Sequence, residues 1–130
     1  MVKKNLLKPG LLSAAASLGL AGGPAQAEVI DLVWTPAGTF ERQLSIAPGK
    51  FAELCGALAK GQSVQWSYEA SSPLDFNIHY HQGKDVVYPA RANASRSEGT
   101  LAVDTAQDYC WMWTNKSAAA VALQVRLHKR

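Results

Sequence analysis

Two segments decide the fold: SVQWSYEA at residues 63–70 and, three residues later, LDFNIHYH at residues 74–81. In both segments apolar and polar residues alternate, which is typical of β-strands with one buried and one exposed face. The intervening Ser71-Ser72-Pro73 favours a turn. The sequence therefore predicts two half-buried strands joined by a turn. Their expected buried residues are Val64, Trp66, Tyr68, Ala70, Leu74, Phe76, Ile78 and Tyr80.

Further strands are expected on both sides of this pair. One precedes it, at residues 39–47. Another, at residues 85–88, follows a Gln82-Gly83-Lys84 turn and is terminated by Pro89. A polar loop is expected over residues 90–98, and the last three strands at 99–103, 108–114 and 119–127. Short alternating strands separated by turn residues predict an all-β fold, an antiparallel β-sandwich of about seven or eight strands.

Residues 50–60 follow a different pattern. Phe51, Leu54, Cys55 and Leu58 fall at helical spacing, which favours a short helix that ends at Gly61. An edge of a strand would accommodate the same cysteine, so both structures remain open for this segment.

The N-terminus has the features of a secretory signal. Three lysines at positions 3, 4 and 8 precede an apolar run over residues 11–20, and Gly22-Gly23-Pro24 precedes the tripeptide Ala25-Gln26-Ala27. This order predicts a signal peptide over residues 1–27. The apolar run is too short and too interrupted for a membrane anchor. We therefore expect residues 28–130 to form one periplasmic or secreted domain with no membrane span.

Removal of the signal peptide changes the charge balance. The chain has 13 Lys and Arg against 10 Asp and Glu, and three of the lysines lie in residues 1–27. The remaining domain is therefore close to neutral. Such a domain lacks the concentrated positive charge needed to bind phosphates, so we expect neither nucleic acid nor an anionic membrane as a partner.

The chain has two cysteines, Cys55 and Cys110. An even number of cysteines in an exported protein favours a disulfide over a metal site or a nucleophile. The flanking residues Gly56 and Trp111 supply no base that would activate a thiol. We therefore expect one disulfide between these two cysteines.

Four short motifs follow one another along residues 53–127. They are Cys55 with Lys60-Gly61 and Val64; Asp75-Phe76-Asn77-Ile78 with Gly83 and Val87-Tyr88; SEGTL at 97–101; and DYCWMWTNK at 108–116. In this order they resemble the GOLD domain, the luminal β-sandwich of the p24 (emp24/gp25L) cargo-receptor family. The corresponding family motifs are Cys with Lys-Gly and a hydrophobic strand, D-F-x-V with a glycine turn and an apolar-Tyr pair, S-x-G-x-F, and G-x-Y-x-F-C-F-x-N-K.

The resemblance implies a GOLD-like β-sandwich, and both cysteines stand at the positions that the family pairs. The family continues into a coiled coil, a membrane span and a cytosolic sorting tail, whereas this sequence reaches Arg130 directly after its last expected strand. Vesicle cargo selection is therefore not carried over. The general use of the domain, which is to bind proteins or lipids on a face of the sandwich, is carried over.

His79 and His81 are the sharpest candidates for metal chemistry. Residues two apart on a strand project from the same face, so the two imidazoles could converge on one ion. Asp75 lies in the same row, and Met112 could approach from a neighbouring strand. Such a set suits copper or zinc. The alternative is that both histidines are solvated on a polar sheet face.

Tyr109, Trp111 and Trp113 share one face of the strand expected at 108–114. On an open face these rings would stack on a sugar or on a partner chain. The alternative is that they fill the core. Cys110 and Met112 then face the other way, so either a bulge intervenes or both faces of this strand are covered.

Sequence patterns of enzymes are missing. The chain has neither G-x-S-x-G nor H-E-x-x-H and no phosphate-binding glycine pattern, so we expect no catalytic residues. The tripeptides Asn93-Ala94-Ser95 and Asn115-Lys116-Ser117 match the N-glycosylation pattern, which is frequent by chance. We therefore infer no function from these two tripeptides.

Three functions follow from these observations. The first is an exported, non-enzymatic binding module of the cell envelope that binds a protein partner on a sandwich face and needs no cofactor. The second, a periplasmic copper or zinc protein, uses His79 and His81. The third is a carbohydrate-binding module that uses Trp111 and Trp113.

Overall fold

The structure, a computed structural model, describes residues 28–130, so the expected signal peptide lies outside the described residues. The strands are β1 (Glu28–Asp31), β2 (Thr39–Ile46), β3 (Phe51–Leu58), β4 (Ser63–Gln82), β5 (Asp85–Ala102), β6 (Gln107–Thr114) and β7 (Val121–Lys129). The all-β fold of about seven or eight strands is confirmed. Over residues 28–130 the structure has no helix of the length and apolarity that a membrane span requires.

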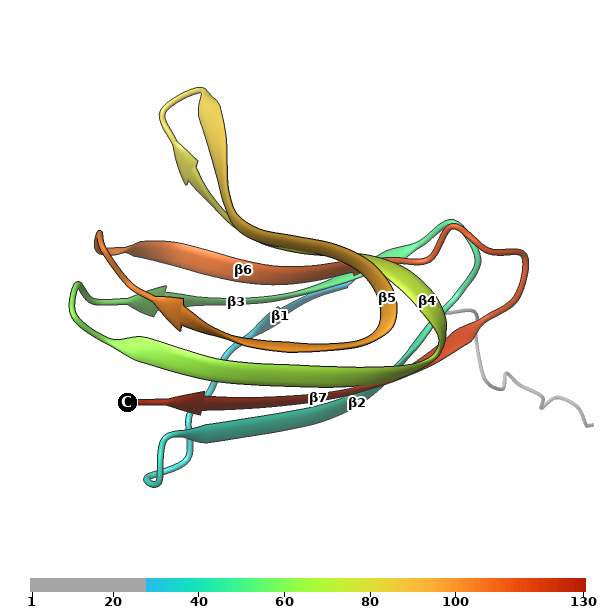
Figure 1. The fold of residues 1–130 in the computed structure, drawn as a ribbon, viewed down its shortest axis with the longest axis horizontal. Helices are drawn as coiled ribbons and strands as arrows, with labels where there is room; N and C mark the ends of the chain where they lie inside the picture. Colours follow the sequence, from blue (N-terminus) through green and yellow to red (C-terminus); the bar gives the residue numbers. More distant parts are fainter. Residues whose placement is uncertain (1–27) are drawn as a thin grey trace, which may run out of the picture.

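Hydrogen bonds join the seven strands into one sheet, which curls so that two leaves face each other (Figure 1). The β7 leaf comprises β2, β7, residues 63–70 of β4 and residues 96–102 of β5. The β6 leaf comprises β1, β3, β6, residues 74–79 of β4 and residues 90–94 of β5. The long β4–β5 hairpin therefore belongs to both leaves and connects them.

One strand pair departs from the expected antiparallel arrangement. β1 pairs with β3 in parallel, with Glu28 opposite Ala52 and Asp31 opposite Cys55. All other pairs are antiparallel. The sheet is therefore mixed, and β1 forms the edge of the β6 leaf.

The short helix expected over residues 50–60 is wrong, because this segment forms strand β3. Its inward residues follow a period of two, with Ala52, Leu54 and Leu58 buried. β3 lies between β1 and β6, and both neighbours satisfy its backbone hydrogen bonds. Pairing with distant strands therefore overrides a local spacing that also fits a helix.

The turn at Ser71-Ser72-Pro73 and the polar loop over 90–98 are also wrong. Residues 71–73 lie within β4, and residues 90–98 lie within β5. Glu69 pairs with Arg96 and Leu74 with Ala94, so β4 carries three extra residues at this point. The irregularity lets the hairpin bend from one leaf to the other, as bulges do in other sheets.

Gly99 allows β5 to pass close to a buried indole. It lies opposite Trp66, and a Cβ at position 99 would be 2.7 Å from Trp66 Cζ2. Any larger residue would have to displace the indole or the strand. Glycine in this strand therefore marks a close approach between a side chain and a neighbouring backbone.

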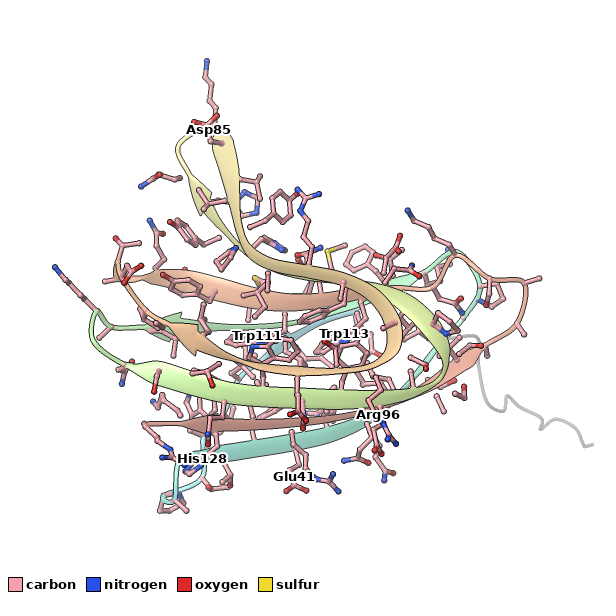
Figure 2. The ribbon with its side chains drawn as sticks, in the orientation of Figure 1. Glu41, Asp85, Arg96, Trp111, Trp113 and His128 are labelled. Atoms are coloured by element: carbon pink, nitrogen blue, oxygen red, sulfur yellow. A yellow bond between two sulfur atoms is a disulfide. The ribbon has the colours of Figure 1, made fainter. Side chains whose placement is uncertain are left out.

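The core lies between the two leaves and is rich in aromatic rings. Phe76 contacts Trp66, Tyr68 and Trp113, with ring centroids 4.9, 5.0 and 5.3 Å away. Trp111 and Trp113 lie between the leaves (Figure 2), and neither has any exposed surface. The alternating residues of β4 and β7 supply much of the remaining core, as the sequence predicts: Val64, Leu74, Ile78, Val121, Leu123, Val125 and Leu127.

Asn115 ties the β6–β7 loop to the end of β2. Its Nδ2 donates to the carbonyl oxygens of Ile46 and Ala119, at 2.9 and 2.8 Å, and its Oδ1 accepts from the backbone N–H of Ser117 at 2.9 Å. The side chain is fully buried. Asn115 is therefore a structural residue, and its place in an N-x-S tripeptide is incidental.

We expect Asn115→Ala to lower the free energy of unfolding by about 1–3 kcal/mol, because the change leaves buried carbonyl groups without a donor. Urea denaturation followed by tryptophan fluorescence measures the effect. Asn93→Ala is the matched control, since Asn93 begins the other N-x-S tripeptide and is exposed. Equal losses in the two variants would contradict the structural role of Asn115.

Candidate functional site

The three aromatic side chains considered for a binding face lie in the core. Trp111 and Trp113 are fully buried, and Tyr109 is buried with its hydroxyl donating to the Thr105 carbonyl at 2.8 Å. Of the two alternatives for these rings, the structure shows the core and not the open face, because no ring can stack on a ligand from inside the sandwich. The carbohydrate-binding function loses the residues on which it depended.

The inner face of β6 is buried and its outer face is partly covered, which resolves the placement of its two kinds of side chain. Trp111 and Trp113 point inward, whereas Cys110 and Met112 point to the outer face of the β6 leaf. β6 pairs with β3 and β4 without an irregularity. Cys55 lies directly opposite Cys110, and the two form the expected disulfide on the outer face.

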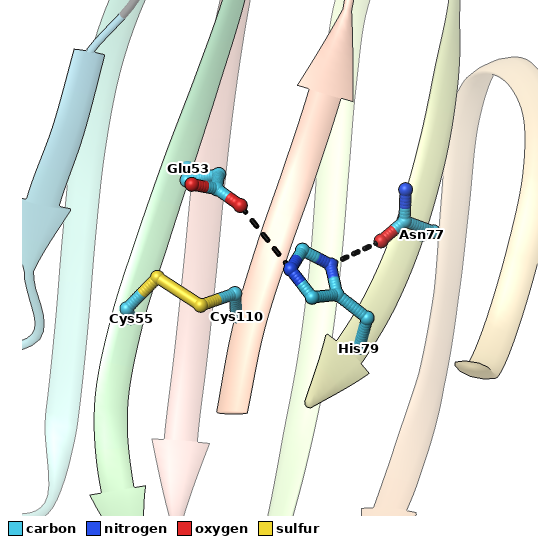
Figure 3. The surroundings of a disulfide bond; sticks show 5 residues. All are labelled: Glu53, Cys55, Asn77, His79 and Cys110. Atoms are coloured by element: carbon cyan, nitrogen blue, oxygen red, sulfur yellow. Dashed lines mark hydrogen bonds and ion pairs between the residues drawn. A yellow bond between two sulfur atoms is a disulfide. The ribbon is translucent and has the colours of Figure 1, made fainter. Parts of the chain in front are cut away.

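A polar cluster surrounds this disulfide (Figure 3). Cys55, Cys110 and His79 stand in one row across β3, β6 and β4. Glu53 and Asn77 lie in the next row, on either side of Met112. His79 Nε2 lies 3.2 Å from Glu53 Oε1, and His79 Nδ1 lies 2.7 Å from Asn77 Oδ1. We call Glu53, Cys55, Asn77, His79 and Cys110 the disulfide cluster.

His79 is the most enclosed polar group of this cluster, with 5% of its surface exposed. Burial lowers the pKa of His79, and the carboxylate of Glu53 offsets part of this effect. Because Asn77 Oδ1 can only accept, His79 donates from Nδ1. The other ring nitrogen, Nε2, faces the Glu53 carboxylate, so the imidazole lies between two polar partners.

The four residues expected to hold copper or zinc are not brought together. His79 and His81 do share a face, with ring centroids 5.4 Å apart. Asp75, however, is engaged by Lys116 Nζ at 2.6 Å and by the side chain of Asn93, and these contacts lower the pKa of its carboxyl group. Met112 lies on the same face and is half-buried.

A different set of three residues is clustered instead. Within residues 28–130, only Glu53, His79 and Cys110 form a group of three His, Cys, Asp or Glu side chains whose ligand atoms all lie within 4.8 Å of one another. The group contains neither His81 nor Asp75. A metal site on this face would therefore centre on His79 and Glu53.

The tip of the β4–β5 hairpin extends beyond the two leaves as an arm, drawn in yellow at the top of Figure 1. In the arm Tyr80 pairs with Val87, His81 with Val86 and Gln82 with Asp85, and Gly83 forms the turn with a positive φ of 63°. Asp85 lies at the tip (Figure 2). Tyr80 anchors the base of the arm through its contact with the Tyr109 ring, at 5.0 Å between centroids.

The side of the arm that faces away from Tyr80 carries exposed apolar surface. Val86 is 37% exposed and Tyr88 is 42% exposed. The guanidinium carbon of Arg91 lies 3.8 Å from the centre of the Tyr88 ring, and this ring lies 5.9 Å from that of His79. We call His81, Val86, Tyr88 and Arg91 the arm face. It continues onto the disulfide cluster.

The outer face of the β7 leaf differs in character. It carries exposed ion pairs, in which Arg96 lies 2.7 Å from Glu69 and Arg126 lies 3.9 Å from Glu41. Such pairs contribute little to stability. Figure 2 places Glu41 on the side of the molecule away from the arm. This face supplies control positions for the arm face.

Sequence reasoning missed Glu53, Tyr88 and Arg91 as site residues. Glu53 stands two residues before Cys55 and therefore shares its face on a strand, but the expected helix concealed this. Val86 and Tyr88 also stand two apart beside a glycine turn, so an exposed apolar face was detectable. Arg91 was not detectable, because its stacking depends on the irregular register next to His79.

No family model matches the chain, and no curated protein matches it. Several solved structures share its fold. PliG of Aeromonas hydrophila, a periplasmic lysozyme inhibitor of g-type lysozyme, has a TM-score of 0.62 and 15% identity over 82% of this chain and all of that chain. PliG of Salmonella Typhimurium has a TM-score of 0.56 and 12% identity over 81% of this chain and all of that chain. The pre-peptidase C-terminal domain of a Bacillus anthracis collagenase has a TM-score of 0.54 and 14% identity over 85% of this chain and all of that chain.

These findings correct the resemblance to the GOLD domain. The similar structures named above are periplasmic inhibitors and a pre-peptidase domain, and no family model supports a GOLD assignment. The likeness to the solved structures establishes the fold.

Proposed function

We propose that this chain is a protein-binding module of the cell envelope, without catalytic activity, and that the arm face makes the contact. The observation that carries the proposal is the exposed Tyr88 ring with Arg91 stacked on it, at the base of a projecting hairpin. Tyrosine and arginine are enriched among the residues that dominate binding energy in protein interfaces.

The geometry of the arm supports this proposal. Val86 and Tyr88 expose apolar surface on one side, and Tyr80 fixes the other side to the domain. A contact surface on a paired hairpin loses less conformational freedom on binding than a flexible loop does. A near-neutral domain with such a surface suits a protein partner better than a polyanion.

Export is supported by three observations. Residues 1–27 have the pattern of a cleaved signal peptide. The domain also contains a disulfide, which is typical of proteins outside the cytoplasm. The PliG proteins that share the fold are described as periplasmic.

We further propose that the partner is a g-type lysozyme. This step is supported by the shared fold of the PliG inhibitors, which act on that class of enzyme. The alignment covers 99–100% of each of these structures, so the likeness extends over the whole of each solved inhibitor chain.

The arm face should determine binding. We expect Tyr88→Ala to weaken the affinity for purified g-type lysozyme at least about tenfold, because truncation of a central interface aromatic typically costs more than 1 kcal/mol. Titration calorimetry measures the affinity, and a cell-wall lysis assay measures inhibition. Glu41→Ala is the control, since Glu41 is exposed on the β7 leaf, and it should bind like the wild type.

Two outcomes would contradict parts of this proposal. Failure of the wild-type chain to bind g-type lysozyme would exclude that partner. Binding that Glu41→Ala weakens and Tyr88→Ala does not would place the contact on the β7 leaf. A thermal unfolding scan of both variants confirms that they are folded, which is expected because both side chains are exposed.

A further inference from the structure

The disulfide cluster brings four ligand-bearing side chains from three strands to one point. The ligand atoms of Glu53, His79 and Cys110 lie within 4.8 Å of one another, and the Cys55 sulfur is bonded to that of Cys110. His79 is almost completely buried, and Glu53 is largely covered. The register sets this arrangement, because Cys55, Cys110 and His79 share one row.

The spacing of Glu53 and His79 matches that of two ligands on one metal ion. Ligand atoms about 2.0–2.1 Å from a zinc ion at a tetrahedral angle lie about 3.3 Å from each other. The observed distance between Glu53 Oε1 and His79 Nε2 is 3.2 Å. Asn77 Oδ1 accepts a hydrogen bond from His79 Nδ1, so Nε2 is the ring nitrogen that would bind an ion placed between it and Glu53 Oε1. Metal-binding histidines are held in this way by an acceptor behind the ring.

The redox state of the disulfide determines whether Cys55 and Cys110 can act as the third and fourth ligands. Sulfur atoms bound to one zinc ion lie about 3.8 Å apart, whereas a disulfide holds them at bonding distance and removes their negative charge. Two ligands alone do not make a structural zinc site, which needs four. The oxidised cluster is therefore an incomplete site, and only a reduced cluster would offer two thiolates, an imidazole and a carboxylate.

We propose that reduction of the Cys55–Cys110 disulfide opens a zinc site formed by Cys55, Cys110, His79 and Glu53. A dithiol reductant transfers two electrons and two protons to the disulfide and becomes a disulfide itself. Zn²⁺ then binds both thiolates, and the two thiol protons are released. This site differs from a His79 and His81 site, and it does not depend on the protein-binding function proposed above.

A reductant can approach the disulfide from the side of Cys55. This residue is half-buried, and a surface hollow of about 370 Å³ lies beside it, lined by Asp31, Leu32, Gly56, Ala57 and Asp108. A thiolate that enters the hollow attacks the Cys55 sulfur, and Cys110 leaves as a thiolate. Cys110 then lies next to the His79 ring, within the cluster.

The test measures zinc affinity of the purified, untagged chain in competition with a chromophoric chelator, before and after reduction with a phosphine. The reduced chain should take up one equivalent, with an affinity at least about 100-fold above that of the oxidised chain, since loss of even an outer-shell partner costs about 10–100-fold. His79→Ala and Glu53→Ala should each weaken uptake by the reduced chain at least about tenfold. His81→Ala, on the same face but outside the cluster, should leave it unchanged.

Cobalt substitution gives a second measurement, because thiolate ligands produce a charge-transfer absorption that carboxylates and imidazoles do not. If the reduced chain unfolds, zinc should restore the near-ultraviolet circular dichroism of its buried tryptophans. Equal affinity of the oxidised and reduced chains would overturn the proposal. Undiminished uptake by His79→Ala and Glu53→Ala, or a reduced chain that stays unfolded in saturating zinc, would also overturn it.

Discussion

Replacing Trp111 with alanine should lower the free energy of unfolding by about 3–5 kcal/mol, which is the typical loss when a buried tryptophan is truncated. Trp111 has no exposed surface and lies opposite Leu54 on β3 and Ile78 on β4. Its removal leaves a cavity at the centre of the β6 leaf that neighbouring side chains cannot fill without leaving their rotamers. Urea denaturation followed by circular dichroism measures the change.

Trp34→Ala is the matched control for this prediction. Trp34 precedes β2, is half-buried, and has Lys129 Nζ 5.1 Å from the centre of its ring. The same substitution there should cost clearly less, because part of the ring is already in contact with water. A Trp111→Ala variant that unfolds like the wild type would show that the ring lies on an open face.

Loss of the disulfide should have an effect of similar size. Cys55 and Cys110 are 55 residues apart in the sequence, and closing a loop of this length stabilises a fold by about 4 kcal/mol in the chain-entropy model. Small domains have a total stability of about 5–15 kcal/mol, so the reduced chain should be marginally stable. We expect the Cys55→Ala, Cys110→Ala double variant to be less stable than the oxidised wild type by about this amount.

The reduced wild type provides the control for the disulfide, because metal-free reduced protein and the double variant should have nearly equal stability. Thiol titration of the denatured, unreduced chain should detect no free thiol. Two free thiols in that titration would contradict the disulfide, and a double variant as stable as the oxidised protein would contradict its contribution.

The alternation of apolar residues predicted the strands that bury one face. Residues 63–70 and 74–81 belong to β4, and β2, β6 and β7 lie close to their expected positions. Each of these strands has a polar side and a core side, so a period of two is visible in the sequence. The face that Trp111 and Trp113 share was predictable for the same reason.

The sequence did not predict which strands pair with each other. β3 carries apolar residues at both helical and strand spacing, and only pairing with β1 and β6 decides between the two. Residues 90–98 are polar because β5 pairs with β4 alone and exposes most of their side chains. Backbone hydrogen bonds hold this strand, and they leave no apolar pattern in the sequence.

The candidate site was predicted in part. The disulfide and the shared face of His79 and His81 followed from export and from strand geometry. The pairing of His79 with Glu53 did not, because it joins β4 to β3 across β6 and depends on the register of three strands. Side-chain contacts of this kind arise from tertiary structure, which a local pattern does not contain.

The most direct test of the proposed function is photo-crosslinking in cells that export the chain. A benzophenone amino acid placed at position 88 or 91 should give a covalent complex with one envelope protein, and the same residue at position 41 should not, because Glu41 lies on the opposite leaf. Mass spectrometry of the complex identifies the partner. No complex from positions 88 and 91, or equal complexes from positions 88 and 41, would contradict the claim that the arm face binds a protein.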